Sequence, residues 1–227
     1  RSAIITGVSN QATGLGHHRS DVPFPREQIK GFPCYLQQAG YYTSNNLKTD
    51  YNVADEPDFI AETWHESSRT AHWRNRPEGT PFFSVFNYMD SHSSRTMTKP
   101  WGWYAQQVLA HLPEDEIIDP ADIVVPPFFR DTPEMRKHLS RVHNSLKLCD
   151  IRIGERLAEL EADGLLDDTI VFCFADHGEG VPRGKSNGIG FGYRASFVLR
   201  VPEQYNDLCP WPSGSVTDEL ISFEDLP

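Results

Sequence analysis

The chain has 227 residues and carries 21 lysines and arginines against 32 aspartates and glutamates, which gives a formal net charge of -11. A surface with this excess of negative charge repels phosphate backbones and anionic bilayers, so nucleic acid is excluded as an expected partner. The length suits one large α/β domain with a sizeable buried core, and we take residues 1–227 as a single domain.

Three other features of the sequence limit its class. Four cysteines lie scattered without CxxC spacing and suggest neither a zinc site nor a disulfide framework. No stretch approaches the roughly 18 consecutive apolar residues of a membrane span, so we expect no span. The chain begins without methionine and stops at Ser-Phe-Glu-Asp-Leu-Pro, so we expect it to be truncated at both ends.

The first predicted elements lie between residues 34 and 88. Residues 34–39 are expected to form a short helix, which Gly40 ends before a strand at residues 41–44. The apolar run at residues 81–88 has the β-rich character of a strand that is buried on both faces.

A long amphipathic helix is predicted from Met135, with Gly164 as its left-handed cap. His138 and His143 lie off its apolar stripe and are expected to be solvated. The apolar positions, three and four residues apart, are Met135, Leu139, Val142, Leu146, Cys149, Ile153, Leu157 and Leu160.

Two further apolar runs, residues 169–175 and 196–201, are predicted to be buried strands. Strands that alternate with helices indicate an α/β fold with a mainly parallel central sheet and helices on both faces. In such a fold the ligand crevice lies at the carboxyl ends of the strands. The side chains that follow each strand are therefore the first candidates for a site.

Ionisable groups follow two of these strands. Asp90 and His92 come directly after residues 81–88, and Asp176 with His177 comes directly after residues 169–175. A glycine-rich loop, residues 181–191, then carries Arg183 and Lys185 next to a candidate metal site. Cations beside a metal-capable cluster are what hydrolysis of an anion requires.

With these residues in view, the chain resembles the formylglycine-dependent sulfatases of the alkaline-phosphatase-like superfamily over nearly its whole length. Arg1 resembles the last residue of the family's Cys-x-Pro-Ser-Arg signature. The resemblance implies that the cysteine, four positions upstream and outside this chain, becomes the formylglycine whose hydrate attacks sulfur. It implies that Arg1 holds that hydrate.

The resemblance extends to other catalytic positions. Residues 46–52 look like the family's Gly-Lys-x-His or Gly-Lys-x-Asp segment, with Leu47 in place of the usual glycine. Lys48 is then the lysine that contacts nucleophile and sulfate, and Asp50 orients the nucleophile. His92 is the histidine near the leaving oxygen, and Lys185 is the late lysine that contacts sulfate.

By the same resemblance, Asp176 and His177 are a metal-ligand pair, and the metal is Ca²⁺. Oxygen ligands suit this cation, whereas an imidazole is a softer ligand than Ca²⁺ prefers. Two consecutive aspartates of the family's metal site have no counterpart here. His17, His18 and Arg183 are candidate substrate contacts, although a loop without a ligand role is an equal interpretation for the two histidines.

The implied function is cleavage of a sulfate ester on a small molecule or glycan, with sulfated carbohydrate the commonest substrate of such members. The resemblance implies a periplasmic or extracellular location. Two alternatives stay open: a phosphodiesterase or phosphatase of the same superfamily with a threonine or serine nucleophile, and a non-catalytic remnant that binds sulfated glycans.

Four tryptophans either stack on a sugar or pack within the fold: Trp64, Trp73, Trp101 and Trp103.

The absence of the nucleophile segment has two expected consequences. The 227 residues alone are expected to be a partial catalytic domain without activity. They are also expected to fold poorly, because loss of the first strand would expose the strands next to it.

Overall fold

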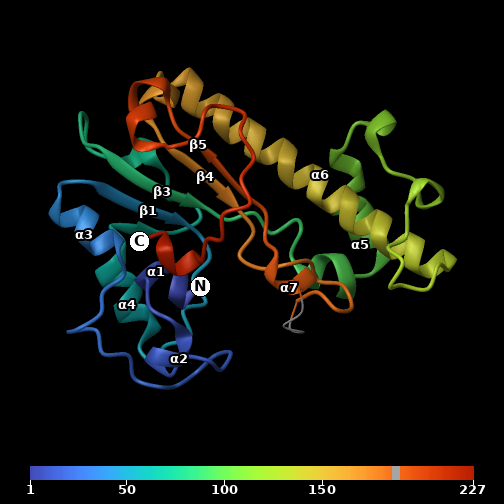
Figure 1. Cartoon of the computed structure of the whole chain (residues 1–227), viewed down its shortest axis with the longest axis horizontal. Helices are drawn as coiled ribbons and strands as arrows, with labels where there is room; N and C mark the ends of the chain where they lie inside the picture. Colours follow the sequence, from blue (N-terminus) through green and yellow to red (C-terminus); the bar gives the residue numbers. More distant parts are fainter. Residues whose placement is uncertain (186–189) are drawn as a thin grey trace. The chain divides into compact units, whose positions relative to one another are not determined.

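The polypeptide divides into two units in the computed structural model, which describes residues 1–185 and 190–227 (Figure 1). Unit 1 comprises Arg1–Asn87 and Val216–Pro227, and unit 2 comprises Tyr88–Ser215. Each unit has its own sheet, so each is described by itself. Both combine helices with strands, and the predicted α/β class is confirmed.

Unit 1 contains a three-stranded parallel sheet in the order β2-β1-β3. Its strands are β1 (Tyr42–Asn46), β2 (Glu66–Ser67) and β3 (Phe82–Phe86). The predicted strands at residues 41–44 and 81–88 are confirmed, as is the short helix, α3 (Pro33–Gln38). The two-residue β2 was not predicted, because so short a strand has no periodicity to detect.

Unit 1 also contains α4 (Glu56–Thr63), which runs between β1 and β2 in the sequence. Aromatic packing joins this helix to the sheet: Trp64 stacks on Phe83 of β3 with ring centroids 5.8 Å apart, and its indole nitrogen donates to the Tyr51 hydroxyl over 3.0 Å. Burial raises the pKa of Tyr51 to about 12. Trp64 and Trp73 are buried, so the packing interpretation is confirmed for these two tryptophans.

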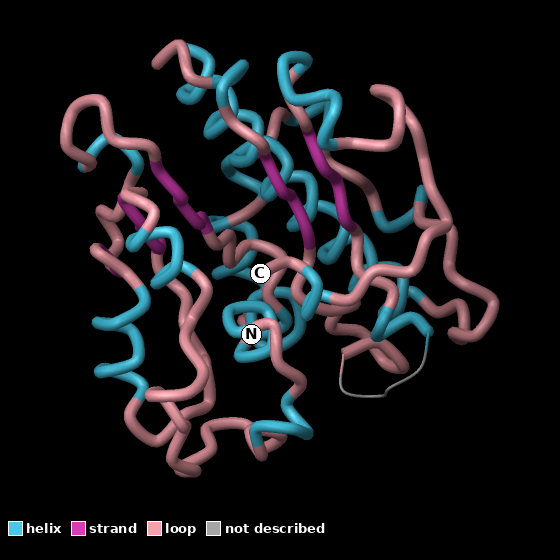
Figure 2. The backbone as a smooth tube through the Cα atoms, turned by 60° about the vertical axis from the view of Figure 1, so that its left-hand side comes forward, coloured by secondary structure: helices cyan, strands magenta, loops and turns pink. Residues whose placement is uncertain are grey.

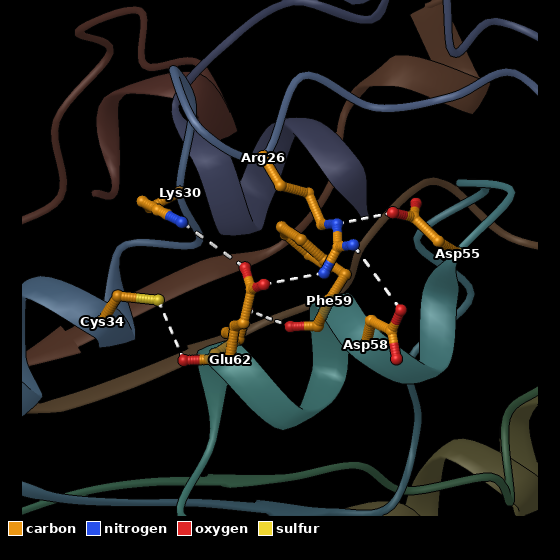
Figure 3. A network of polar contacts seen from close by, with 8 residues as sticks. Arg26, Lys30, Cys34, Asp55, Asp58, Phe59 and Glu62 are labelled. Atoms are coloured by element: carbon orange, nitrogen blue, oxygen red, sulfur yellow. Dashed lines mark hydrogen bonds and ion pairs between the residues drawn. The ribbon is translucent and has the colours of Figure 1, made fainter.

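A cluster of charges anchors the loop between α2 (Asn10–Thr13) and α3 to helix α4 (Figure 3). The Arg26 guanidinium pairs with Asp55 at 2.5 Å, with Glu62 at 2.7 Å and with Asp58 at 3.5 Å. Lys30 also reaches Glu62, at 3.5 Å. Several carboxylates around one guanidinium form a network, which holds a long loop better than one exposed pair does.

Unit 2 is built around α6 (Pro133–Ala162), the helix that the apolar stripe predicted. The Thr132 side chain accepts from the Met135 amide over 3.2 Å and caps its first turn. Gly164 follows its end with a φ of 69°, the left-handed conformation predicted for it. His143 is exposed as expected, but His138 is half-buried, and this burial lowers its pKa.

The two strands of unit 2 lie side by side (Figure 2) and pair in antiparallel fashion. They are β4 (Val171–Phe174) and β5 (Phe197–Arg200), within the predicted strand ranges. A mainly parallel sheet was predicted, and this antiparallel pair is an exception to that direction. Burial on both faces was also expected, but Phe172 is 46% and Val198 62% exposed. A sheet of two strands has too little area to be enclosed between two layers of helices.

The remaining described elements are short. In unit 2, Tyr104 and Val108, at the end of α5 (Trp101–Gln107), pack with Leu148 of α6 in a buried cluster. No helix within residues 1–185 and 190–227 is both long enough and apolar enough to cross a membrane. The short elements not yet named are α1 (Ser2–Thr6), η1 (Trp73–Asn75), η2 (Ser94–Thr98), η3 (Leu109–His111), η4 (Glu114–Glu116), η5 (Pro120–Asp122), η6 (Leu166–Asp168), α7 (Gly190–Tyr193), η7 (Glu203–Leu208) and η8 (Phe223–Asp225).

Candidate functional site

A ladder of side-chain amides crosses the carboxyl ends of the strands in unit 1. Asn87, which directly follows β3, donates to the Asn45 side-chain oxygen over 3.0 Å and to the Asn46 carbonyl over 3.1 Å. The fully buried Asn45 donates in turn to the Ser67 hydroxyl on β2 over 3.0 Å. No role was predicted for these asparagines from the sequence, although their position at strand ends was a signal that could have found them.

Arg1 joins this ladder to the turn that carries Lys48. Its Nε donates to the Thr49 carbonyl over 2.7 Å, and its Nη2 donates to the Lys48 carbonyl over 2.7 Å and to the Asn87 side-chain oxygen over 2.9 Å. The structure therefore brings together Arg1 and residues 48–50, which lie far apart in the sequence. Asp50 is exposed at the end of this turn.

Left-handed backbone marks the segment around this turn. Asp50 and Asn52 have φ values of 52° and 57°, and Arg19 has a φ of 55°. The Arg19 amide donates to the Asn52 side chain over 2.8 Å, which ties the loop of His17 and His18 to the Lys48 segment. Non-glycine residues in this conformation are strained and gather at functional sites.

A cavity of about 420 Å³ opens on the same loop. His17 forms part of its wall, whereas His18 is exposed nearby and does not line it. The side-chain oxygen of Asn10, another lining residue, has no hydrogen-bond partner within the described residues. Amide and imidazole groups around such a hollow can bind hydroxyl groups. The full lining is Asn10, Gln11, Gly14, Gly16 and His17.

In unit 2, the segment after β3 is anchored by a buried carboxylate. Asp90 has no exposed side-chain surface and pairs with Arg95 at 3.0 Å and with Arg152 of α6 at 2.6 Å. The sequence predicted Asp90 and His92 together as ionisable residues that directly follow residues 81–88. The structure shows that the Asp90 carboxylate is engaged by two guanidinium groups of the same unit.

His92, two residues later, has a defined ring orientation. Its Nδ1 accepts from the Ser94 amide over 3.2 Å and lies 2.7 Å from the Ser94 hydroxyl. Because Nδ1 accepts a hydrogen bond, the proton of the neutral ring belongs on Nε2. His92 is thus arranged to offer Nε2–H as a donor.

Asp176 and His177 follow β4, as the sequence predicted. The His177 Nε2 lies 3.5 Å from an Asp176 oxygen, and its Nδ1 lies 2.7 Å from the Gly178 carbonyl, to which it donates in the neutral ring. This tautomer leaves a lone pair on Nε2, the usual arrangement for a metal-binding histidine. The Asp176 carboxylate and the His177 Nε2 are two ligand groups that fit one side of a cation site. No group of three or more such residues positioned for a metal occurs within residues 1–185 and 190–227.

The loop that continues to Lys185 folds back on itself. The Lys185 amide donates to the Glu179 carbonyl over 2.8 Å, and burial raises the pKa of the Glu179 side chain. Arg183 is exposed, with a φ of 68°. Residues 186–189 of the predicted glycine-rich loop lie outside the described residues. The predicted site residues therefore fall in both units: Arg1, His17, His18, Lys48 and Asp50 in unit 1, and His92, Asp176, His177, Arg183 and Lys185 in unit 2.

The two loops of unit 2 are packed against each other at Gly180. A Cβ atom at this glycine would lie 2.5 Å from the Ser93 Cβ and 3.1 Å from the Ser93 Cα. Only glycine fits here without moving the segment of His92 away from the segment of Asp176. The close approach thus sets the spacing between these two candidate residues.

Gly180→Ala is expected to lower the free energy of unfolding by about 1–3 kcal/mol through overpacking. Turnover by the full-length protein should fall roughly tenfold, because displaced catalytic groups lose rate steeply with distance. Chemical denaturation and steady-state kinetics measure the two effects.

The matched control is Gly154→Ala on α6, where an added Cβ meets no atom within 4 Å. It should leave turnover unchanged. Adding Ser93→Gly to Gly180→Ala removes the 2.5 Å contact and leaves the 3.1 Å contact with the Cα of residue 93, so it should restore most of both quantities. A double variant as impaired as Gly180→Ala alone would show that the contact with Ser93 is not the cause.

Comparison with known proteins gives consistent matches. The sulfatase family model matches residues 1–227. The chain is 30% identical to an ulvan-active sulfatase of Formosa agariphila and 23% identical to the human N-sulphoglucosamine sulphohydrolase, in both cases over 100% of its own length. It covers 42% and 49% of these two relatives, and so spans less than half of each.

A solved structure supports the fold. It is described as a complex with its substrate D-glucosamine-2-N,6-O-disulfate, and the TM-score is 0.52 at 16% sequence identity. The match covers 88% of this chain and 60% of that one. At 16% identity the likeness shows a shared fold and says nothing about the substrate of this chain.

Proposed function

Because the chain belongs to the sulfatase family, we propose that the full-length protein hydrolyses sulfate esters of carbohydrates. The observation that carries the proposal is the family match over residues 1–227, together with a curated relative at 30% identity that is named as an ulvan-active sulfatase. The reaction is attack on sulfur and departure of a sugar oxygen.

The proposed substrate class rests on two supports. The chain's curated relatives are named for ulvan and for N-sulphoglucosamine. The cavity of about 420 Å³ at His17 is lined in part by amide and imidazole side chains, which can bind the hydroxyl groups of a sugar. His17, His18 and Arg183 are proposed to contact the part of the substrate beyond the sulfate.

The chain's own residues would perform three tasks. Arg1, Lys48 and Lys185 supply positive charge to the sulfate oxygens, where negative charge develops during the reaction. Asp50 orients the nucleophile at the end of the turn that Arg1 holds. His92 donates the proton that an alkoxide leaving group needs from Nε2 of its protonated ring, and the Ser94 hydroxyl, 2.7 Å from Nδ1, can accept from the other N–H of that ring.

The proposal also requires two groups that the residues above do not supply, a formylglycine and a divalent cation. Formylglycine, formed from a cysteine before Arg1 in the full-length protein, supplies the nucleophile. Asp176 and His177 would hold one side of a divalent cation, proposed to be Ca²⁺, which supplies charge neutralisation when bound.

Incubating the full-length protein with sulfated glucosamine is expected to release inorganic sulfate, which ion chromatography measures. A chelator should abolish the release, because the proposed site depends on a divalent cation. Added Ca²⁺ should restore it. Hydrolysis of 4-nitrophenyl phosphate is measured in parallel, as a test of phosphatase activity.

Faster turnover of the phosphate ester than of any sulfate ester would indicate a phosphatase of the same superfamily. Binding of sulfated glycan without any turnover would identify a non-catalytic protein. Full activity in the chelator would remove the cation from the proposal.

A further inference from the structure

We propose that Asn87 is a positioning residue that sets the orientation of the Arg1 guanidinium and, through it, the turn of Lys48. This inference rests on the proposed function, in which Arg1 and Lys48 contact the sulfate. Asn87 lies at the end of β3, and its side-chain oxygen accepts from Arg1 Nη2 over 2.9 Å. The same Nη2 donates to the Lys48 carbonyl over 2.7 Å.

The Asn87 amide has only one orientation that satisfies its neighbours. Its nitrogen donates to the Asn45 side-chain oxygen over 3.0 Å and to the Asn46 carbonyl over 3.1 Å, while its oxygen faces Arg1. A rotated amide would place its oxygen against two acceptors and its nitrogen against a guanidinium donor. The position of the Asn87 oxygen, and so the acceptor offered to Arg1, is fixed by the strand beside it.

The ladder is rigid because its middle member is buried. Asn45 has 0% exposure, and its amide donates to Ser67 over 3.0 Å and to the Lys48 carbonyl over 3.3 Å. The Lys48 carbonyl therefore accepts from both Arg1 and Asn45. Buried polar networks whose members are satisfied hold one arrangement strongly.

The uncharged state of Asn87 matters for an anionic substrate. An amide oxygen orients the guanidinium without cancelling its charge, whereas a carboxylate at this position would form an ion pair with it. Asn87 thus supplies orientation without placing a negative charge beside Arg1.

The test compares Asn87→Ala with Asn46→Ala in the full-length protein. Asn46 is the matched control, because its amide also donates two hydrogen bonds, to the Arg69 carbonyl over 2.9 Å and to the Ala71 carbonyl over 3.2 Å, and neither partner is Arg1. Asn87→Ala should lower kcat on a sulfated sugar about tenfold, the scale on which misplaced groups lose rate. The kcat of Asn46→Ala should stay within about twofold of the wild-type value.

A double-mutant cycle with Arg1→Lys separates positioning from general stability. If Asn87 acts through Arg1, Asn87→Ala should add less than about twofold to the loss caused by Arg1→Lys, because coupled residues are not additive. A full tenfold further loss in the Arg1→Lys background would overturn the proposal. So would an equal loss of kcat in Asn46→Ala.

Hydrogen exchange supplies a measurement that needs no turnover. Amides of residues 47–52 should exchange faster in Asn87→Ala than in Asn46→Ala, because the turn loses its fixed guanidinium. Equal exchange in the two variants would overturn the proposal even if the full-length protein hydrolysed no sulfate ester. Asn87→Ser, which also removes the amide, replaces the alanine variant if that variant is recovered unfolded.

Discussion

Replacing His92 with alanine is expected to lower kcat on a sugar sulfate by about 10²–10⁴, the range of general acid catalysis. The loss on 4-nitrophenyl sulfate should be much smaller. A sugar alkoxide is a poor leaving group and needs a proton, whereas nitrophenolate leaves readily as an anion. Comparing the two substrates therefore measures proton donation by His92 separately from its other contacts.

The structural basis for this prediction is the orientation of the His92 ring, whose Nδ1 lies 3.2 Å from the Ser94 amide nitrogen and 2.7 Å from the Ser94 hydroxyl. Nε2 of the protonated ring is the proposed acid. The matched control is His111→Ala, since His111 is an exposed histidine in the same unit. It should leave kcat unchanged on both substrates. Equal losses on both substrates in His92→Ala would exclude the role of acid, and no loss would remove His92 from the mechanism.

Asp90→Ala is expected to lower the free energy of unfolding by about 3–5 kcal/mol, the cost of removing one partner from a buried ion pair. The Asp90 side chain is 0% exposed and lies between Arg95, at 3.0 Å, and Arg152, at 2.6 Å. Its loss leaves two guanidinium groups, each about a third exposed, without this shared carboxylate. Urea denaturation of the variant and the unchanged protein measures the difference.

Asp167→Ala is the control for this prediction. Asp167 also pairs with an arginine, Arg200 at 3.0 Å, but its side chain is 94% exposed. Exposed ion pairs contribute about 0–1 kcal/mol, so this variant should be nearly as stable as the unchanged protein. If the two substitutions lowered the free energy of unfolding by similar amounts, the burial of Asp90 would not be what makes its ion pairs stabilising.

Asp90 also links stability to the proposed chemistry, because it lies two residues before His92 on the same segment. Arg152 belongs to α6, so the ion pair ties this segment to the longest helix of unit 2. Loss of the pair should therefore also make the segment of His92 less rigid.

Much of the secondary structure followed from the sequence alone. The apolar stripe predicted α6, and the apolar runs at residues 81–88, 169–175 and 196–201 predicted β3, β4 and β5. These predictions succeeded because burial of one helical face, or of a run of β-branched and aromatic residues, leaves a local pattern. The family resemblance and the strand-end positions of His92 and Asp176 also came from local sequence.

Pairing between distant residues was decided only by the tertiary structure. The antiparallel pairing of β4 with β5 has no local signature, because an apolar run does not specify the direction of its neighbour. The sequence shows Asp90 as an ionisable residue after a strand, whereas its ion pair with Arg152, 62 residues later, is seen only in the tertiary structure.

The same distinction applies to the candidate site. The sequence determined the family and the residue types: an arginine at position 1, a lysine in a polar turn and a histidine after a strand. The tertiary structure decided that Arg1 bonds to the turn of Lys48 and that Asn87 orients it. The physical reason is that hydrogen bonds and ion pairs depend on distances of a few ångströms between groups that the sequence separates by dozens of residues.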